Sequence, residues 1–268
     1  MDLGILIGVA VAAGAIIGGN IMEGGHLESL IGIPAFIIVI GGTVGAVLVQ
    51  FPLKVVKDAM ATGMKLFKSP KQDPAKLVDE IVDLAQQARK DGILGLEKSV
   101  ATASHPLLSK GILMAVDGCD STVIRDTLET VIAQEEEHAE NAAKVFEAAG
   151  GYSPTIGIIG AVLGLIHVMS NLSDINAVGT GIAAAFVATI YGVAAANIAF
   201  LPTAGRIKVR HQADGRVMEL IVSGVLAIQE GLNPKLVRER LAAYVPAHGK
   251  KKKGVEESGA GDAVTEAA

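Results

Sequence analysis

Two long apolar stretches constrain this chain more than any other feature. Residues 150–173 and 175–205 contain no Asp, Glu, Lys or Arg, and only Asp174 separates them. The hydrocarbon core of a bilayer is about 30 Å thick, and a helix needs about 20 apolar residues to cross it. Because both stretches meet that length, the sequence predicts a helical membrane protein.

Two further apolar stretches lie near the start of the chain. Residues 3–22 are uncharged, and residues 30–53 are uncharged up to Lys54. No Lys or Arg precedes the first stretch, so we expect a retained span and not a secretory signal peptide. The fold class predicted is therefore all-α: a polytopic membrane protein with four transmembrane helices in two hairpins and a helical cytoplasmic domain.

Composition and charge agree with this class. Charged residues make up only 19% of the 268 residues, whereas soluble domains carry about 25%. A formal net charge of −5 gives no basic surface for nucleic acid. The single Cys119 excludes an intrachain disulfide. We find no enzyme signature and no metal-ligand motif, and expect no cofactor.

The distribution of Lys and Arg predicts the orientation. Both residue types follow the second and fourth apolar stretches, whereas the short loops at 23–29 and around 174 carry neither. The positive-inside rule then places both short loops outside, and both termini and the large insert in the cytoplasm. The predicted division is a hairpin at 1–53, a helical insert at 54–149, a second hairpin at 150–205, C-terminal helices at 206–247 and a disordered tail at 248–268. Lys250–Lys253 in that tail either keep it soluble or touch anionic lipid.

Capping residues predict the helices of the cytoplasmic segments. An N-cap followed by proline starts a helix, and glycine ends one. The predicted boundaries are a start at Asp73-Pro74, an end at Asp91-Gly92, a short helix from Ile93 to before His105-Pro106, a helix from Ser121 stopped by Gly150-Gly151, continuation of the fourth span through Gly231, and a last helix from Asn233-Pro234 to near Tyr244.

The spans themselves offer little acid–base chemistry. His167 is the only ionisable group there besides two tyrosines, and it is either an imidazole satisfied by neighbours or a functional group. Pro154 is either a first-turn proline or, together with Pro202, one of two hinges at one membrane face. Thr155 and Thr189 either bond to carbonyls of their own helices or line a wet path.

Several separated motifs resemble the MotA-type flagellar stator proteins, on the branch with short outer loops. Residues 151–157 (GYSPTIG) and 160–165 (GAVLGL) are similar to the third-span motif of that family. Residues 88–97 (ARKDGILGLE) resemble its cytoplasmic motif, residues 200–202 (FLP) the end of its fourth span, and residues 227–234 (AIQEGLNP) its C-terminal signature. The resemblance extends from the start of the chain to about residue 244.

The resemblance implies a stator subunit of the bacterial flagellar motor in the inner membrane. Five such chains would surround MotB-like single-span partners that carry the membrane aspartate, and ion flow would drive torque on the rotor protein FliG. By motif, Arg89 and Glu97 would contact the rotor, Pro154 and Pro202 would couple ion passage to movement, and Thr189 would line the ion path.

The same resemblance addresses the transported ion. Sodium selection needs several oxygen ligands, and sodium-type relatives place threonine where Ala161 and Ala188 stand. We therefore predict protons, with Thr155 and Thr189 as polar groups of the path. Three alternatives remain at this stage: an ExbB/TolQ-like energiser of outer-membrane processes, a solute transporter and a structural membrane scaffold.

Overall fold

The computed structural model describes residues 3–66, 73–170 and 172–245, so the predicted tail with Lys250–Lys253 lies outside the described residues. Within those ranges every regular element is a helix, which confirms the all-α prediction. The α-helices are α1 (Leu3–Met22), α2 (Ile33–Phe36), α3 (Gly42–Gln50), α4 (Leu53–Lys65), α5 (Pro74–Asp91), α6 (Glu97–Val100), α7 (Pro106–Val116), α8 (Ser121–Ser170), α9 (Ile175–Ala194), α10 (Leu201–Gln229) and α11 (Pro234–Ala242). Short 3₁₀ segments η1 (Leu27–Leu30) and η3 (Ile93–Leu96) and π segments η2 (Ile37–Gly41) and η4 (Ala195–Phe200) connect them.

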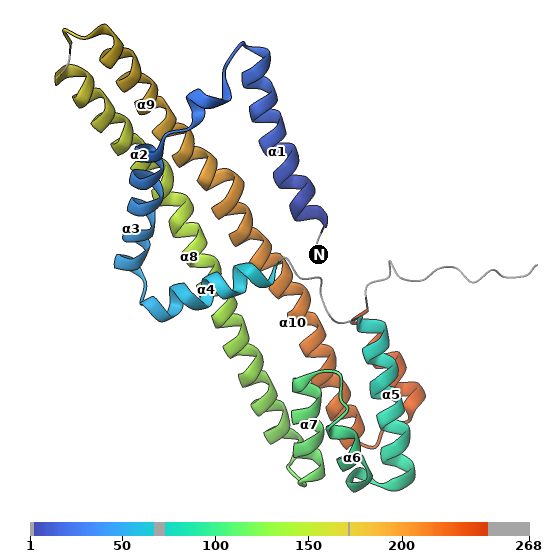
Figure 1. Cartoon of the computed structure of the whole chain (residues 1–268). Coiled ribbons are helices and arrows are strands. Elements are labelled where there is room, and N and C mark those ends of the chain that lie inside the picture. Colours follow the sequence, from blue (N-terminus) through green and yellow to red (C-terminus); the bar gives the residue numbers. More distant parts are fainter. Residues whose placement is uncertain (1–2, 67–72, 171, 246–268) are drawn as a thin grey trace, which may run out of the picture.

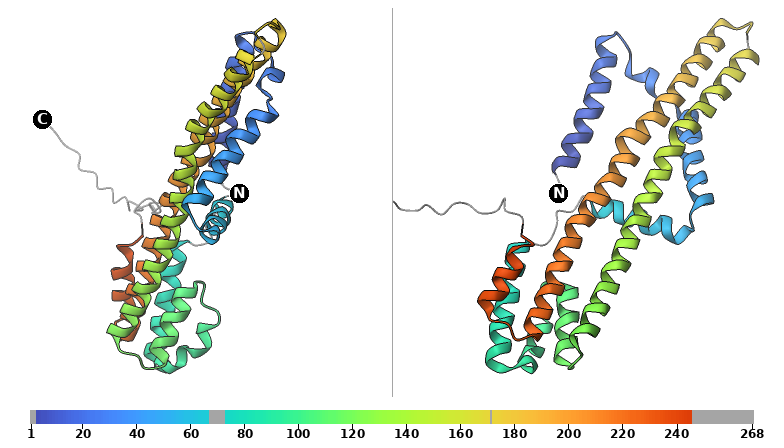
Figure 2. Two further views of the ribbon diagram at one scale, coloured as in Figure 1. Left: turned by 90° about the vertical axis from the view of Figure 1, so that its left-hand side faces the viewer. Right: turned by 180° about the vertical axis from the view of Figure 1, so that it is seen from behind.

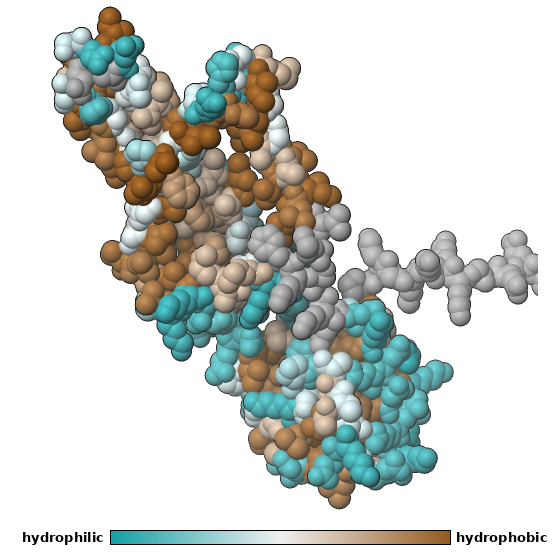
Figure 3. Space-filling model, in the orientation of Figure 1, coloured by the Kyte–Doolittle hydropathy of each residue, from teal (hydrophilic) through white to brown (hydrophobic). Residues whose placement is uncertain are grey.

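Four helical segments of the described chain are long and apolar enough to cross a membrane. They are Gly4–Met22, Leu27–Gln50, Ser121–Ser170 and Val178–Gln229, the last two extending well beyond the apolar stretch. Figure 3 shows apolar surface over one half of the molecule and hydrophilic surface over the other. The chain is thus a multi-pass membrane protein with a polar helical end.

Two long rods organise the molecule. Figures 1 and 2 show α8 running antiparallel to the continuous rod of α9, η4 and α10 over the whole length. The helices α5, α6, α7 and α11 gather around the polar end of these rods, while α2 and α3 lie along the apolar end. Helix α1 stands to one side and buries none of its apolar window.

The second apolar stretch ends earlier than predicted. Helix α3 stops at Gln50, Phe51 is extended with φ −121° and ψ 142°, and Pro52 caps α4. Proline disfavours helical geometry in the residue before it, which explains the break at Phe51. Leu53 therefore begins a new helix and does not end the span. Pro34 lies in the first turn of α2, where proline is tolerated.

The predicted helix end at Gly150-Gly151 is wrong. Helix α8 continues through both glycines and through Pro154 to Ser170. Gly150 is buried, and a Cβ placed on it would lie 2.6 Å from Leu201 Cδ2. Here glycine permits close helix packing instead of ending a helix. The first-turn interpretation of Pro154 is wrong for the same reason.

The fourth span is confirmed as the start of a longer helix. The π segment η4 joins α9 to α10, which ends at Gln229, and Gly231 follows with φ 68°. The predicted continuation through Gly231 is thus accurate to two residues. Helix termini are ordinarily assigned to within that margin.

The polar end has its own apolar core. It contains Leu77 and Ile81 of α5, Leu108 of α7, Leu128 of α8 and the buried stretch of α10, residues 220–228. The predicted α5 start is confirmed, because the Asp73 carboxylate accepts a hydrogen bond from the Ala75 N–H at 3.0 Å. Gly92 ends that helix with φ 78°.

Two further predictions for the polar end have opposite outcomes. Asn233 caps α11 by accepting from the Lys235 N–H at 3.0 Å, as predicted. The apolar pattern after Ser121 also predicts that Val123 packs against a neighbour. Val123 is instead 49% exposed, so the apolar face of α8 begins at Ile124.

Candidate ion path and coupling site

The second hairpin is held by a seam of small residues. A Cβ placed on Gly157 would lie 2.9 Å from the Ala188 carbonyl oxygen, and one on Gly160 would lie 2.9 Å from Ala188 Cβ. One on Gly192 would lie 2.6 Å from the Ser153 carbonyl oxygen. Small side chains let the backbones of α8 and α9 approach closely, where dispersion and interhelical hydrogen bonds hold helices together in lipid.

A buried hydrogen bond fixes the polar side of this seam. The Ser153 hydroxyl donates to the Gly192 carbonyl oxygen at 3.0 Å, and Ser153 is fully buried. Sequence reasoning missed this bond, although a serine beside proline in an apolar span is a signal that a hydroxyl must find a partner.

Pro154 lies inside α8, one turn beyond Gly150. Proline has no N–H, so the usual helical bond to the Gly150 carbonyl cannot form. Gly150 itself packs on Leu201, the residue before Pro202. The structure therefore brings the two prolines close to the same α8–α10 contact, as the hinge hypothesis requires.

Pro202 follows the π segment η4. The Leu201 N–H bonds to the Ala196 carbonyl, five residues back, and Pro202 occupies the next position, on the exposed surface. Single π turns often occur at functional sites, and proline deletes a further bond of the ladder. The π turn that ends at Leu201 and the proline at position 202 thus interrupt the regular α-helix at neighbouring positions.

The four residues assigned to the ion path have different environments. Thr155 is exposed and donates to the Tyr152 carbonyl at 2.8 Å, whereas the half-buried Thr189 donates to the Ala185 carbonyl at 3.4 Å. Ala188 is buried in the seam against Gly160, and Ala161 is half-buried. The structure brings Ala188 and Thr189 to the α8–α9 contact, while Thr155 lies on an outer face of α8.

His167 is exposed near the loop between α8 and α9. The seam residues of α8 and α9 carry no carboxylate: they are Ser153, Gly157, Gly160 and Gly164 of α8 and Gly181, Ala185, Ala188 and Gly192 of α9. The packed seam itself therefore offers no titrating acid.

Tyrosines join the first span pair to the second, and sequence reasoning missed both contacts. The Tyr191 hydroxyl accepts from the Gly32 N–H at 3.1 Å and donates to the Leu30 carbonyl at 2.7 Å. The Tyr152 hydroxyl donates to Gln50 Oε1 at 2.8 Å. The available signal was the rule that tyrosine in an apolar run needs a partner for its hydroxyl.

Arg89 and Glu97 lie at the far polar end, on α5 and at the start of α6, and both are exposed. Gln87 ties the turn between them, because its Nε2 donates to the Gly95 carbonyl and its Oε1 accepts from the Ser99 hydroxyl, both at 2.9 Å. A Cβ placed on Gly95 would lie 2.8 Å from Asp91 Cβ. The close approach to Asp91 thus requires glycine at position 95.

One face of α1, formed by Gly8, Gly14 and Gly18, is open within the described residues. Cβ atoms placed on Gly8, Gly14 and Gly18 would have no atom within 4 Å, in contrast to those on Gly160 and Gly164. An apolar cavity of about 490 Å³ separates α1 from α10, with Arg206 at its border. The α1 face is therefore unpartnered within the single chain.

These features define a class: a polytopic helical membrane protein with a seam of small residues between two helices, the prolines Pro154 and Pro202 near one helix contact, and a charged module, Arg89 and Glu97, at its far polar end. Residues 99–219 match the MotA/TolQ/ExbB proton channel family, and residues 6–92 match the family Motility protein A N-terminal. Motility protein A of Bacillus subtilis is 36% identical over 249 residues, which cover 92% of each chain.

Two solved structures have the same architecture. The chain aligns with the structure of C. jejuni MotAB at a TM-score of 0.87 and 29% identity, covering 92% of this chain and 97% of that one. It aligns with the flagellar MotAB stator complex from Bacillus subtilis at a TM-score of 0.84 and 34% identity, covering 91% and 96%. The chain belongs to the MotA family of flagellar stator proteins.

Proposed function

We propose that this chain is the proton-path and lever subunit of a flagellar stator whose titrating acid is supplied by a MotB-like single-span partner. The observation that carries the proposal is the absence of any carboxylate from the packed seam of α8 and α9. A proton relay through a membrane ordinarily uses an ionisable side chain. The MotAB complexes similar to this chain contain a second component that can bring one.

The proposed orientation places both termini and the polar end in the cytoplasm and the molecule in the bacterial inner membrane. Residues 1–53 and 150–205 would form the membrane part, and residues 54–149 and 206–247 the cytoplasmic part. The α4 helix supports this division, since it crosses α8 (Figure 1) and carries Lys54, Lys57 and Lys65. An amphipathic basic helix is suited to the membrane surface.

The proposed transported ion is the proton. Ala161 and Ala188 offer no side-chain oxygen, and Ala188 is buried against Gly160. Thr189 and Thr155 supply the polar groups of the path, although each already bonds to a carbonyl of its own helix. A sodium ion needs more oxygen ligands than these to replace its hydration shell.

The proposed assembly is a ring of five chains around the partner. The unpartnered glycine face of α1 supports self-association, because small residues mark helix contacts in lipid. Arg89 and Glu97 would engage FliG at the cytoplasmic rim, and Pro154 and Pro202 would convert proton passage into movement of the rods.

Proteoliposomes test whether this chain supplies the proton path and its partner supplies the titrating acid. Proton uptake driven by a membrane potential should require both this chain and its MotB-like partner, and it should disappear when the partner's membrane aspartate is replaced by asparagine. Proton uptake by this chain alone would overturn the proposal.

Swimming assays in a stator-deleted strain test the ion. With both proteins expressed, speed should fall with a protonophore and stay constant as external sodium is varied at fixed pH. Speed that follows sodium would refute the proton assignment while leaving the stator role intact.

A further inference from the structure

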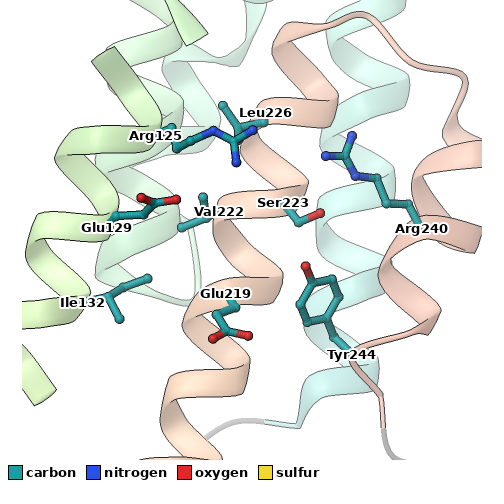
Figure 4. Close-up of a pocket in the computed structure, with 9 residues that line it drawn as sticks. All are labelled: Arg125, Glu129, Ile132, Glu219, Val222, Ser223, Leu226, Arg240 and Tyr244. Carbon is teal, nitrogen blue, oxygen red and sulfur yellow. The ribbon is translucent and has the colours of Figure 1, made fainter. Parts of the chain in front are cut away.

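A small polar pocket lies at the far polar end of the molecule, away from the seam. Its volume is about 170 Å³, and it opens between α8, α10 and the end of α11 (Figure 4). The polar side chains that line it are Arg125 and Glu129 of α8, Glu219 and Ser223 of α10, Arg240 of α11, and Tyr244.

Ser223 distinguishes this pocket from an ordinary surface hollow. The buried polar side chains of the described chain are Thr43, Ser153 and Ser223. The first two donate to carbonyl oxygens, at 2.6 Å and 3.0 Å. Ser223 is 7% exposed and forms no hydrogen bond within the described residues, and Figure 4 shows its hydroxyl directed into the pocket. The hydroxyl oxygen is reached from the opening of the pocket, so it can hydrogen-bond to a bound group.

The charged side chains of the pocket are also open to a ligand. Within the described residues Arg125, Glu129 and Glu219 form no ion pair, and only Arg240 does, with Glu230 at 3.3 Å. Arg125 and Glu129 are four residues apart on one helix, but arginine before glutamate is the less favourable order for such a pair. Four charges thus face one small pocket without neutralising one another.

The arrangement of these charges selects the kind of ligand. Figure 4 shows both guanidinium groups toward one end of the pocket and the Glu219 carboxylate toward the other, with the Glu129 carboxylate on the α8 side, below Arg125. Guanidinium groups bind carboxylate or phosphate in a two-point geometry, and carboxylates accept from ammonium groups. A simple anion would be repelled by the two glutamates, and a simple cation by the two arginines.

We propose that this pocket binds a small zwitterion. Its phosphate or carboxylate end lies between Arg125 and Arg240 and accepts hydrogen bonds from the Ser223 and Tyr244 hydroxyls, and its ammonium end lies against Glu129 and Glu219. The ligand is a free solute and not a lipid headgroup. Glu129 and Gly150 are on the same helix, so the pocket is about 30 Å from the apolar half.

The probe for this site is O-phosphoethanolamine, with inorganic phosphate and ethanolamine as single-charge comparators. The full chain, purified with its MotB-like partner, is titrated by calorimetry and by phosphorus NMR. We expect saturable binding of O-phosphoethanolamine at least about tenfold tighter than of either comparator. Absence of saturable binding, or equal affinity for inorganic phosphate, would overturn the proposal.

Three variants locate the site. Arg125→Gln should weaken binding of O-phosphoethanolamine by about tenfold or more, and Ser223→Ala by about fivefold. Glu129→Gln should abolish the preference over inorganic phosphate, because it removes one partner of the ammonium end. Unchanged affinity in Arg125→Gln, or an unchanged preference in Glu129→Gln, would sink the assignment.

Two matched controls keep the test specific. Arg238→Gln removes an arginine of α11, the helix that also carries Arg240. Arg238 pairs with Asp79 at 2.6 Å and does not line the pocket. Glu230→Gln breaks the ion pair of Arg240 without changing a lining residue. Both should bind O-phosphoethanolamine at least as tightly as the wild type, whereas a loss in either equal to that of Arg125→Gln would show that general destabilisation causes the effect.

Discussion

Single glycines decide how closely the two rods of this protein approach. Gly157→Ala should destabilise the second hairpin by about 1–3 kcal/mol, because the new Cβ would overpack the contact. It would lie 2.9 Å from the Ala188 carbonyl oxygen and 3.2 Å from Gly192 Cα, both backbone atoms that side-chain rotation cannot move. Thermal unfolding of the full chain in detergent measures the change.

Gly151→Ala is the matched control for that substitution. It lies in the same helix, and its Cβ would have no atom within 4 Å. Alanine should stabilise α8 there by up to about 1 kcal/mol through helix propensity. Shifts of the same sign in both variants would contradict the tight seam.

His105 gives the polar end a dependence on pH. Its Nδ1 accepts from the Leu107 N–H at 3.0 Å and so caps α7 in the neutral form. Burial lowers the pKa of His105 below its ordinary value, and the charges of Asp214 and Glu80 oppose that shift only in part. Because the folded state favours the neutral form, the cap contributes fully above the ordinary pKa of about 6.5. It is lost as pH falls below that value.

Hydrogen exchange of the α7 amides checks this effect. After correction for intrinsic exchange, protection should fall between about pH 7.5 and pH 5.5, by an amount equivalent to about 1 kcal/mol. His105→Asn keeps an acceptor that does not titrate, so it should remove the fall. Equal pH dependence in both proteins would exclude His105 as the cause.

At the scale of elements, the sequence predicted boundaries wherever a side chain acts on its own backbone. Asp73 and Asn233 cap their helices through contacts two residues away, so local pattern sufficed. Gly150 was misinterpreted as a helix end. Glycine is needed there because the backbone packs against Leu201, far away in the sequence, and only the folded structure reveals that contact. The π segments η2 and η4 leave no comparable signal in composition.

For the candidate site, as for the helices, local features were predictable and contacts between distant residues were not. Pro154 and Pro202 were expected near one level because they lie at the ends of two apolar stretches, and both lie near the contact of Gly150 with Leu201; their role as hinges stays a prediction. The Tyr191 bonds to Leu30 and Gly32 join residues about 160 positions apart (191 − 30 = 161 and 191 − 32 = 159). A single sequence carries no record of such a pairing, so those contacts appear only in the structure.

Pro154→Ala tests whether the irregular elements are a hinge. The change restores a helical N–H to a continuous helix, so the chain should stay folded and assembled, with stability unchanged or increased by up to about 3 kcal/mol. Torque, measured by swimming in a stator-deleted strain, should be abolished or severely reduced. Wild-type swimming with normal expression would remove Pro154 from the mechanism.

At the scale of the whole molecule, one continuous helix links the apolar half to the polar end. Helix α8 has 50 residues, which corresponds to about 75 Å. It shares the core of the polar end with α5, α7 and α10, so the proposed movement at the seam would carry the α5–α6 turn with it. The proposed lever would place Arg89 and Glu97, near the α5–α6 turn, at the end of the molecule farthest from the spans (Figure 1).

Charge reversal at that end is the most direct test of the lever. Arg89→Glu and Glu97→Lys should each weaken engagement of the rotor by about twofold to fivefold, since exposed charge pairs are worth up to about 1 kcal/mol. Both side chains are exposed and form no ion pair within the described residues, so their loss should leave the fold intact. Lys90→Glu, an exposed neighbour outside the proposed pair, serves as the control. Torque is measured from tethered-cell rotation under load with both stator proteins expressed. Normal torque in both single reversals and in the double reversal would make Arg89 and Glu97 ordinary surface residues, and would place the rotor contact elsewhere on the polar end.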